Sequence, residues 1–153
     1  MNKTLLIQAL IEALREEFET LQTSSRKARA DGNDTESKAE GKYDTRSTEE
    51  NYLADGLARQ AVAAAEAAAA CENLPLLDFS DGAPIELSAV VQLEFPDETT
   101  WFFLAPAGGG TEISCEGITF TVVTPESPLG AQLIGRKVGE KTTAPKTRIL
   151  AVR

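Results

Sequence analysis

The chain has 153 residues, which is enough for one domain or two small ones. Its formal net charge of −9 excludes phosphate-backbone binding as the main source of affinity, because that mode needs a surplus of Lys and Arg. We therefore expect a protein partner with a basic surface and no independent DNA binding. The chain has no histidine and no pair of closely spaced cysteines, which excludes zinc-ribbon, His-metal and imidazole general-base chemistry.

The first residues, MNKTLLIQALIEALREE, form an amphipathic pattern that Gln8 and Glu12 interrupt, and this pattern is not typical of a signal peptide. No run approaches the roughly 20 apolar residues of a membrane span. We therefore expect no membrane partner and a reducing, cytoplasmic setting. In that setting Cys71 and Cys115 are expected to be small buried hydrophobes, with a disulfide as the alternative.

Apolar residues at spacings of three and four predict a first helix, capped by Asn2 or Thr4 and extending to about Ala30. Its predicted stripe is Ile7, Leu10, Leu14, Phe18 and Leu21. The breaker Asp31-Gly32-Asn33 is expected to end this helix.

A second helix is predicted to start near Ser47 or Thr48, where a hydroxyl precedes two glutamates, and to end at Asn73-Leu74-Pro75. Its predicted stripe is Leu53, Leu57, Ala61, Ala64, Ala68 and Cys71. Large side chains on one helix facing small ones on the other predict a close antiparallel coiled-coil hairpin over residues 1–75. The charged residues 26–50 would form its tip, at the end of arms roughly 40 Å long at about 1.5 Å per residue.

After Leu76 the hydrophobic period changes to two. Strands are predicted over residues 84–95, 99–104, 111–114, 117–123 and 147–152. Ser127 followed by Pro128 is an N-cap and N1 pair that predicts a short helix, which Gly135 stops. The predicted fold class is α+β, with the hairpin followed by a small antiparallel β domain with one short helix over residues 76–153.

Two features of this β domain suggest sites but have simpler structural interpretations. Gly108 to Gly110 lacks the Lys-Ser/Thr pair and long helix of a phosphate loop, so a hairpin loop is favoured. Four aromatic residues could line an apolar pocket, but in so small a domain they are more often core. They are Trp101, Phe102, Phe103 and Phe120.

The carboxylates of residues 26–50 are open to two interpretations. They include Asp31, Asp34, Glu36, Glu40 and Asp44. Lys and Arg residues are interspersed with them, so one interpretation is an ordinary solvated face. A long arm that ends in carboxylates can also deliver them into a deep site on another molecule, where they complete the shell of a metal ion. The chain shows no self-contained active site, so we expect it not to be an enzyme itself.

The segment from Val122 to Glu140, VVTPESPLGAQLIGRKVGE, resembles the C-terminal signature of the bacterial Gre transcript cleavage and elongation factors. The order of a strand, a capped short helix and two glycines carries the resemblance. The layout along the whole chain is also similar to that family, which implies an FKBP-like C-terminal domain.

The resemblance implies binding to bacterial RNA polymerase. The globular domain would dock at the polymerase secondary channel through Glu126, Ser127 and Pro128. The coiled coil would enter the channel and place tip acids beside the catalytic Mg²⁺, where they help to hydrolyse the 3′ end of backtracked RNA. The metal ion belongs to the polymerase, so the resemblance implies no cofactor and no metal site in the isolated chain.

At the tip, the resemblance implies catalytic assistance by Asp34, Glu36 and Glu40. Asn33 or Asp34 stands at the family's aspartate position, and Glu36 stands at its glutamate. The family's leucine is missing, and extra residues follow Ser37 and Glu40. One alternative is therefore a polymerase modulator that does not stimulate cleavage. From another class, the alternative is an FKBP-like ligand-binding or isomerase module with a dimerising helical arm.

Overall fold

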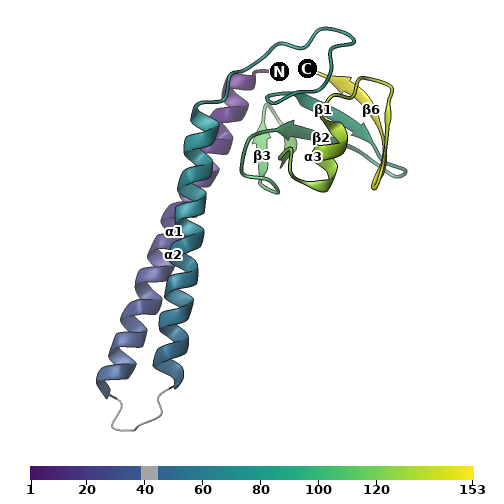
Figure 1. The fold of residues 1–153 in the computed structure, drawn as a ribbon. Coiled ribbons are helices and arrows are strands. Elements are labelled where there is room, and N and C mark those ends of the chain that lie inside the picture. Colours follow the sequence, from purple (N-terminus) through teal and green to yellow (C-terminus); the bar gives the residue numbers. More distant parts are fainter. Residues whose placement is uncertain (39–44) are drawn as a thin grey trace. The chain divides into compact units, whose positions relative to one another are not determined.

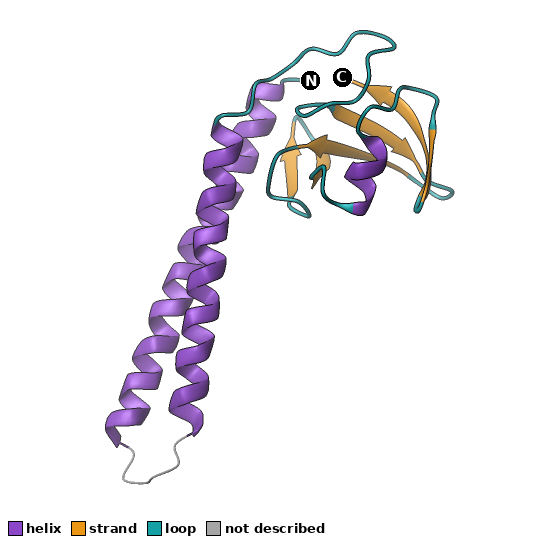
Figure 2. Ribbon diagram, viewed as in Figure 1, coloured by secondary structure: helices purple, strands orange, loops and turns teal. Residues whose placement is uncertain are grey.

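The computed structural model describes residues 1–38 and 45–153, with the side chains of 35–38 left out. The chain divides into two compact units, one formed by residues 1–13 and 67–153 and the other by residues 14–66. Figure 1 traces two long helices and then a sheet with a short helix, and Figure 2 separates the helices from the strands. The α+β class and the helical hairpin are thereby confirmed. The predicted boundary near residues 74–76 falls in the segment that follows the second helix.

Helix α1 (Lys3–Lys38) begins as predicted, because the Asn2 side chain accepts hydrogen bonds from the main-chain N–H groups of Thr4 at 3.0 Å and Leu5 at 3.3 Å. Its apolar stripe buries Leu6, Ile7, Leu10 and Leu14. Phe18 and Leu21 lie on the same stripe but are only half-buried.

The predicted end of α1 near Ala30 is wrong, because the helix runs through Asp31-Gly32-Asn33 to Lys38. A glycine inside a helix costs only about 1 kcal/mol relative to alanine, which tertiary packing readily offsets. Gly32 is buried, and a Cβ atom there would lie 2.9 Å from Oδ1 of Asn51 on the neighbouring helix. The glycine therefore permits a close approach of the two helices where the sequence suggested a break.

Helix α2 (Thr45–Glu72) starts before the predicted Ser47 or Thr48. Ser47 does not cap the helix from outside. Its buried hydroxyl donates to the main-chain carbonyl of Gly32 at 3.0 Å, and Ser25 donates to the carbonyl of Ala54 at 2.7 Å. Much of the stretch 26–50 is thus paired helix, and the prediction that all of it forms the tip is wrong. Residues 39–44, which include Glu40 and Asp44, lie outside the described residues.

The predicted stripe of α2 is correct for Ala61, Ala64, Ala68 and Cys71, which are all buried. It is wrong at Leu53, whose side chain is 56% exposed, while the adjacent Ala54 is fully buried. The smaller residue lies where the Ser25 hydroxyl bonds to the main chain of α2, and small residues allow two helices to approach closely.

The second half of the chain forms a six-stranded sheet of order β3-β4-β2-β1-β6-β5. Its strands are β1 (Val90–Glu94), β2 (Thr99–Leu104), β3 (Glu112–Cys115), β4 (Ile118–Val123), β5 (Lys141–Thr143) and β6 (Lys146–Val152). The short helix α3 (Pro128–Leu133) lies between β4 and β5 in the chain. Strand β5, at the sheet edge, was missed because three polar residues carry no apolar alternation.

The expectation of a purely antiparallel sheet is wrong for one pair, because β2 and β4 run parallel, with Phe103 opposite Val122. Strand β3 occupies the sheet edge and turns into β4 at Glu116-Gly117, where both residues have positive φ. That two-residue turn suits a tight antiparallel hairpin. After this turn β4 pairs between β3 and β2 in the sheet, and it runs parallel to β2.

The predicted long strand over 84–95 is also wrong, since only Val90–Glu94 pairs as a strand. Ser88 has a positive φ of 71° and breaks the extended run. Its hydroxyl accepts from the main-chain N–H of Leu77, and its own N–H donates to the carbonyl of Leu104. Ile85 exchanges main-chain hydrogen bonds with Gly135 and Arg136, so the alternating pattern here reflects burial without strand pairing.

Apolar residues from four strands, from α3 and from the segment before β1 form a core on one face of the sheet. Its members are Ile85, Ala89, Val91, Leu93, Phe102, Leu104, Val123, Leu133 and Ile149. Phe103 and Phe120 are almost completely buried as well, and the ring of Trp101 lies 6.2 Å from that of Phe120. The prediction that the aromatic residues are core is confirmed for Phe102, Phe103 and Phe120.

Candidate functional site

The segment from Thr124 to Gly130 has the best-defined local geometry among the predicted site residues. Ser127 has an extended conformation and caps α3, since its Oγ accepts from the N–H of Gly130 at 3.0 Å. The same hydroxyl donates to the carbonyl of Thr124 at 2.8 Å. Pro128 follows at the first helical position, where its missing N–H costs nothing. The predicted cap and helix start are confirmed.

Gly130 is required at its position because the main chain passes directly over it. A Cβ atom there would lie 1.9 Å from the carbonyl oxygen of Thr124 and 2.9 Å from Oγ of Ser127. The 1.9 Å contact is with a main-chain atom, so movement of a side chain cannot relieve it. Glycine and serine together therefore hold the end of β4 against the first turn of α3.

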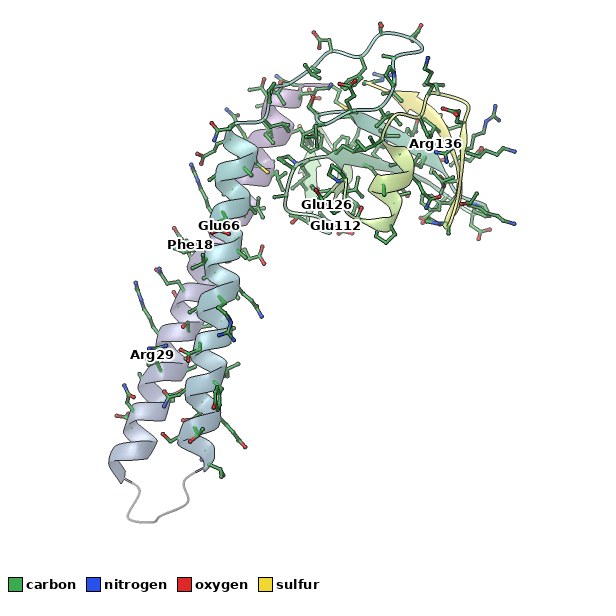
Figure 3. The ribbon with its side chains drawn as sticks, viewed as in Figure 1. Phe18, Arg29, Glu66, Glu112, Glu126 and Arg136 are labelled. Atoms are coloured by element: carbon green, nitrogen blue, oxygen red, sulfur yellow. The ribbon has the colours of Figure 1, made fainter. Side chains whose placement is uncertain are left out.

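Glu126 stands at the apex of this turn with an exposed side chain. Figure 3 shows it in the loop that leads into α3. Its neighbours Ser127 and Pro128 are the N-cap and the first residue of α3, so the carboxylate directly precedes the capped start of a helix. The structure thus brings Glu126, Ser127 and Pro128 together as one exposed turn.

Gln132 is a connecting residue that the sequence analysis missed. Its Oε1 accepts from the main-chain N–H groups of Thr143 at 2.9 Å and Ala144 at 3.3 Å, and its Nε2 donates to the carbonyl of Ala144 at 2.6 Å. These bonds attach α3 to the β5–β6 hairpin. Nothing in the local pattern around Gln132 indicates such bonds, because its partners lie more than ten residues further along the chain.

The three predicted tip acids are not brought together within the described residues. Asp34 is exposed and lies on α1, four residues before the helix ends at Lys38. The main chain of Glu36 belongs to the same helix, but its side chain is not among those described. Glu40 lies outside the described residues. Their roles stay predictions.

The helix pair that carries these acids is held together by small polar contacts as well as by apolar ones. Arg29 of α1 forms an ion pair with Asp55 of α2, with both side chains half-exposed, and Figure 3 shows Arg29 on α1. An exposed pair of this kind adds at most about 1 kcal/mol. The buried hydroxyls of Ser25 and Ser47 are therefore the more specific determinants of how α1 and α2 align.

Among the described side chains, Lys3 and Cys71 have shifted pKa values, and both lie far along the chain from the predicted site residues. Burial lowers the pKa of Lys3, an effect that the nearby charge of Asp78 partly offsets. Its ammonium group donates to the carbonyl of Leu77 and lies 4.5 Å from the centre of the Phe79 ring. Burial raises the pKa of the Cys71 thiol, which donates weakly to the carbonyl of Ala107.

The cysteines are both buried and unpaired with each other, which confirms the expected thiol state. Over residues 1–38 and 45–153, no group of three or more Cys, Asp or Glu side chains is placed to hold a metal ion. Within the same described ranges, no helix has the length and apolar character needed to cross a membrane.

No protein-family model matches the sequence, and no curated protein matches it. Among solved structures, the chain is similar to the GreA factor homolog 1 (Gfh1) protein of Thermus thermophilus, with 19% identity over 96% of this chain and 94% of that one. A second structure, of the transcription factor Gfh1, has 18% identity over 95% and 94% of the two chains. Gfh1 of Thermus aquaticus has 21% identity over 95% and 92%. The TM-score is 0.35 for each of the three.

Proposed function

We propose that this chain is a Gre-like transcription elongation factor that binds bacterial RNA polymerase in the cytoplasm. The observation that carries the proposal is the turn at Glu126-Ser127-Pro128. These residues match the docking loop of the Gre signature, and here they form an exposed turn with a carboxylate at its apex. The carboxylate would pair with a basic surface of the polymerase, in keeping with the net charge of −9.

The helical hairpin would act as a probe that enters the secondary channel. Helices α1 and α2 are long, and the buried bonds Ser25–Ala54 and Ser47–Gly32 fix their alignment toward the distal end. A stiff arm of this kind positions side chains at its end more precisely than a loop does. The acids carried there would approach the polymerase's own catalytic site.

In this proposal, Asp34, Glu36 and Glu40 supply negative charge near the Mg²⁺ of the polymerase, which would provide Lewis-acid chemistry for hydrolysis of the backtracked RNA 3′ end. The chain would hold and orient carboxylates and would not perform the hydrolysis itself. Its acids are separated along the sequence, so they could complete a metal shell only together with polymerase ligands.

A modulator that enters the channel without stimulating cleavage is the second candidate. The continuation of α1 through Lys38 favours it. On a continuous helix Asp34 and Glu36 are two positions apart, and such residues do not share a face. Only one of the two acids could then point toward a given metal ion.

Transcript shortening in backtracked elongation complexes tests the proposal. We expect wild-type protein to bind polymerase and to accelerate the appearance of shortened RNA. Asp34→Ala or Glu36→Ala should reduce this acceleration by at least about tenfold, the lower range for losing a group that supports a metal site. Glu16→Ala, at an exposed position of α1, is the matched control and should leave the rate unchanged.

Two other results have distinct meanings. Binding to polymerase without faster cleavage would support the modulator and reject the catalytic role of the acids. Failure of the wild-type chain to bind polymerase would reject both candidates. Glu126→Lys should weaken binding in either case, because it reverses the charge at the apex of the docking turn.

A further inference from the structure

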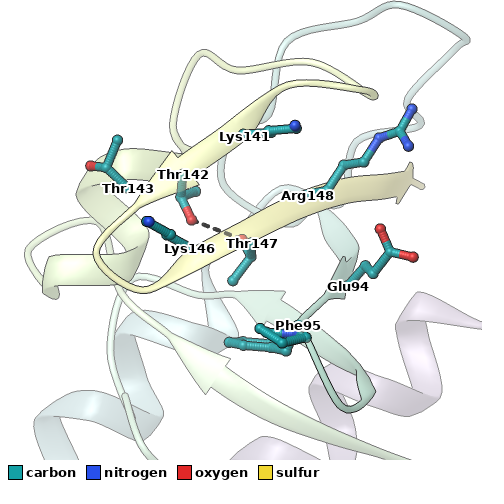
Figure 4. Close-up of a pocket in the computed structure, with 9 residues that line it drawn as sticks. Glu94, Phe95, Lys141, Thr142, Thr143, Lys146, Thr147 and Arg148 are labelled. Carbon is teal, nitrogen blue, oxygen red and sulfur yellow. Dashed lines mark hydrogen bonds between the residues drawn. The ribbon is translucent and has the colours of Figure 1, made fainter.

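The hairpin of β5 and β6 gathers three cations on one face of the sheet. Lys141 pairs in register with Arg148, and Lys146 lies two residues from Arg148 on the same strand. Cross-strand partners have Cβ atoms about 5 Å apart, and residues two apart on a strand share a face. Figure 4 shows the three side chains around one cavity. Like charges placed directly opposite one another destabilise a sheet, so this arrangement has a cost.

No ion pair in the described part of the chain neutralises this cluster. None of its three cations takes part in an ion pair within residues 1–38 and 45–153. Glu94 of β1 is in register with Arg148 and lines the same cavity, but it is the only carboxylate in the lining. Three positive charges therefore face one negative charge in a chain whose overall charge is strongly negative. Because ionic strength screens charges beyond about 10 Å, the local sign decides what binds here.

The cavity beside the cations has a volume of about 610 Å³, and Phe95 and Pro96 supply an apolar wall. This volume lies within the range of about 300–1,000 Å³ that is usual for small-molecule sites. The Thr142 hydroxyl donates to the carbonyl of Pro145 and lies 2.8 Å from the hydroxyl of Thr147. Since these hydroxyls are already bonded within the hairpin, the cations are the groups left to recognise a ligand.

We propose that this cavity binds the phosphates of a nucleotide, with Lys141, Lys146 and Arg148 on the phosphates and Phe95 against the base. A polyphosphate concentrates several negative charges within a few ångströms, which matches three cations at adjacent register positions. An extended acidic peptide presents side chains on one face only about every 7 Å, so it would place few carboxylates within the cluster. Stacking of a base on an aromatic ring adds affinity whatever the base, because every base has a π-face.

A free nucleoside polyphosphate and the 5′ end of a single-stranded nucleic acid share this chemistry. The site lies on the β5–β6 hairpin and the β1–β2 turn, and its lining includes neither the docking turn nor the tip acids. It goes beyond the proposed function and does not depend on it.

Calorimetric titration of the full chain at low salt tests the inference. We expect affinity to fall in the order GTP, GDP, GMP, with guanosine not binding. Each of Lys141→Gln, Lys146→Gln and Arg148→Gln should weaken GTP binding by roughly fivefold, and the triple variant by about a hundredfold. Lys137→Gln changes an exposed lysine that does not line the cavity, and it should leave the affinity unchanged. Phe95→Leu should weaken GTP and spare inorganic tripolyphosphate.

Further titrations distinguish the source of the phosphates and the class of ligand. A short 5′-triphosphate oligonucleotide that binds more tightly than GTP identifies a nucleic-acid end, whereas tighter GTP binding identifies the free nucleotide. Absence of GTP binding at millimolar concentration would overturn the inference. So would equal binding by the triple variant with an unchanged circular dichroism spectrum. Tighter binding of polyglutamate than of either probe would replace the nucleotide with an acidic polypeptide.

Discussion

Gly130 and Thr124 are in contact through their main chains, because a Cβ atom on Gly130 would lie 1.9 Å from the Thr124 carbonyl oxygen. The end of β4 and the start of α3 are therefore too close to admit a side chain at Gly130. The exposed turn between them, which carries Glu126, owes its shape to this contact and to the Ser127 cap.

Replacement of Gly130 by alanine should destabilise the chain by roughly 1–3 kcal/mol, the usual cost of overpacking, because the Thr124 main chain must move. Gly56→Ala is the matched control. Gly56 is within α2, and a Cβ atom there would lie 4.0 Å from the Arg59 guanidinium at an ordinary contact distance, so alanine there should stabilise by up to about 1 kcal/mol. Denaturant unfolding of both variants measures the two effects. Equal stability of Gly130→Ala and wild type would show that the contact is not maintained in solution.

Ser127→Ala should cost about 1 kcal/mol of stability, because Gly130 loses its capping acceptor and the Thr124 carbonyl loses a donor. Ser127→Asp retains a capping acceptor and should recover much of that loss. Thermal unfolding compares the variants. If Ser127→Ala melts with wild type, the cap contributes nothing to folding.

Ser25→Ala and Ser47→Ala should each destabilise the helix pair by about 1 kcal/mol, the net worth of one hydrogen bond. Both serines are buried and donate to carbonyls of the other helix, so neither loss can be replaced by water. Thr23→Ala changes an exposed position of α1 and is the control. Hydrogen exchange of amides in residues 14–66 reports the effect, and unchanged protection in both variants would contradict it.

Gln132→Leu should loosen the β5–β6 hairpin, since it removes the acceptor of the Thr143 and Ala144 amides and the donor to the Ala144 carbonyl. We expect faster hydrogen exchange at Thr143 and Ala144 while the amides of β1 and β2 stay protected. Gln132→Glu keeps the acceptor but not the donor and should give an intermediate result. Uniform loosening of the whole sheet would indicate a general packing role.

The raised pKa of Cys71 gives a stability change with a definite sign. An unfolded thiol ionises near pH 9.0, whereas the buried thiol stays protonated to higher pH. The folded chain therefore holds more protons in that window, and stability falls as pH rises above about 9. Cys71→Ala should remove this component, so the difference in unfolding free energy between wild type and variant should shrink from pH 8 to pH 10. An increasing difference would contradict the prediction.

The sequence by itself determined the two helices, the change to strands after Leu76 and the capped start of α3. Each of these depends on contacts between residues close in the chain. A stripe at spacings of three and four or an alternation of two is a local property, and so is a Ser-Pro pair at a helix start. The positions of Ser127, Pro128 and Gly135 could be predicted for the same reason.

Only the tertiary structure decided the remaining features, because each depends on a partner far along the chain. Gly32 lies within α1 where Ser47 and Asn51 of α2 approach it. Ala54, and not Leu53, lies on the buried face of α2, where its main-chain carbonyl accepts a hydrogen bond from Ser25. The parallel pairing of β2 with β4 and the bonds of Gln132 to β5 likewise join separate elements. The cation cluster of the β5–β6 hairpin has the same origin, since register alone places Lys141 opposite Arg148. Local patterns specify which element forms, and long-range packing specifies where it ends and which side chains meet.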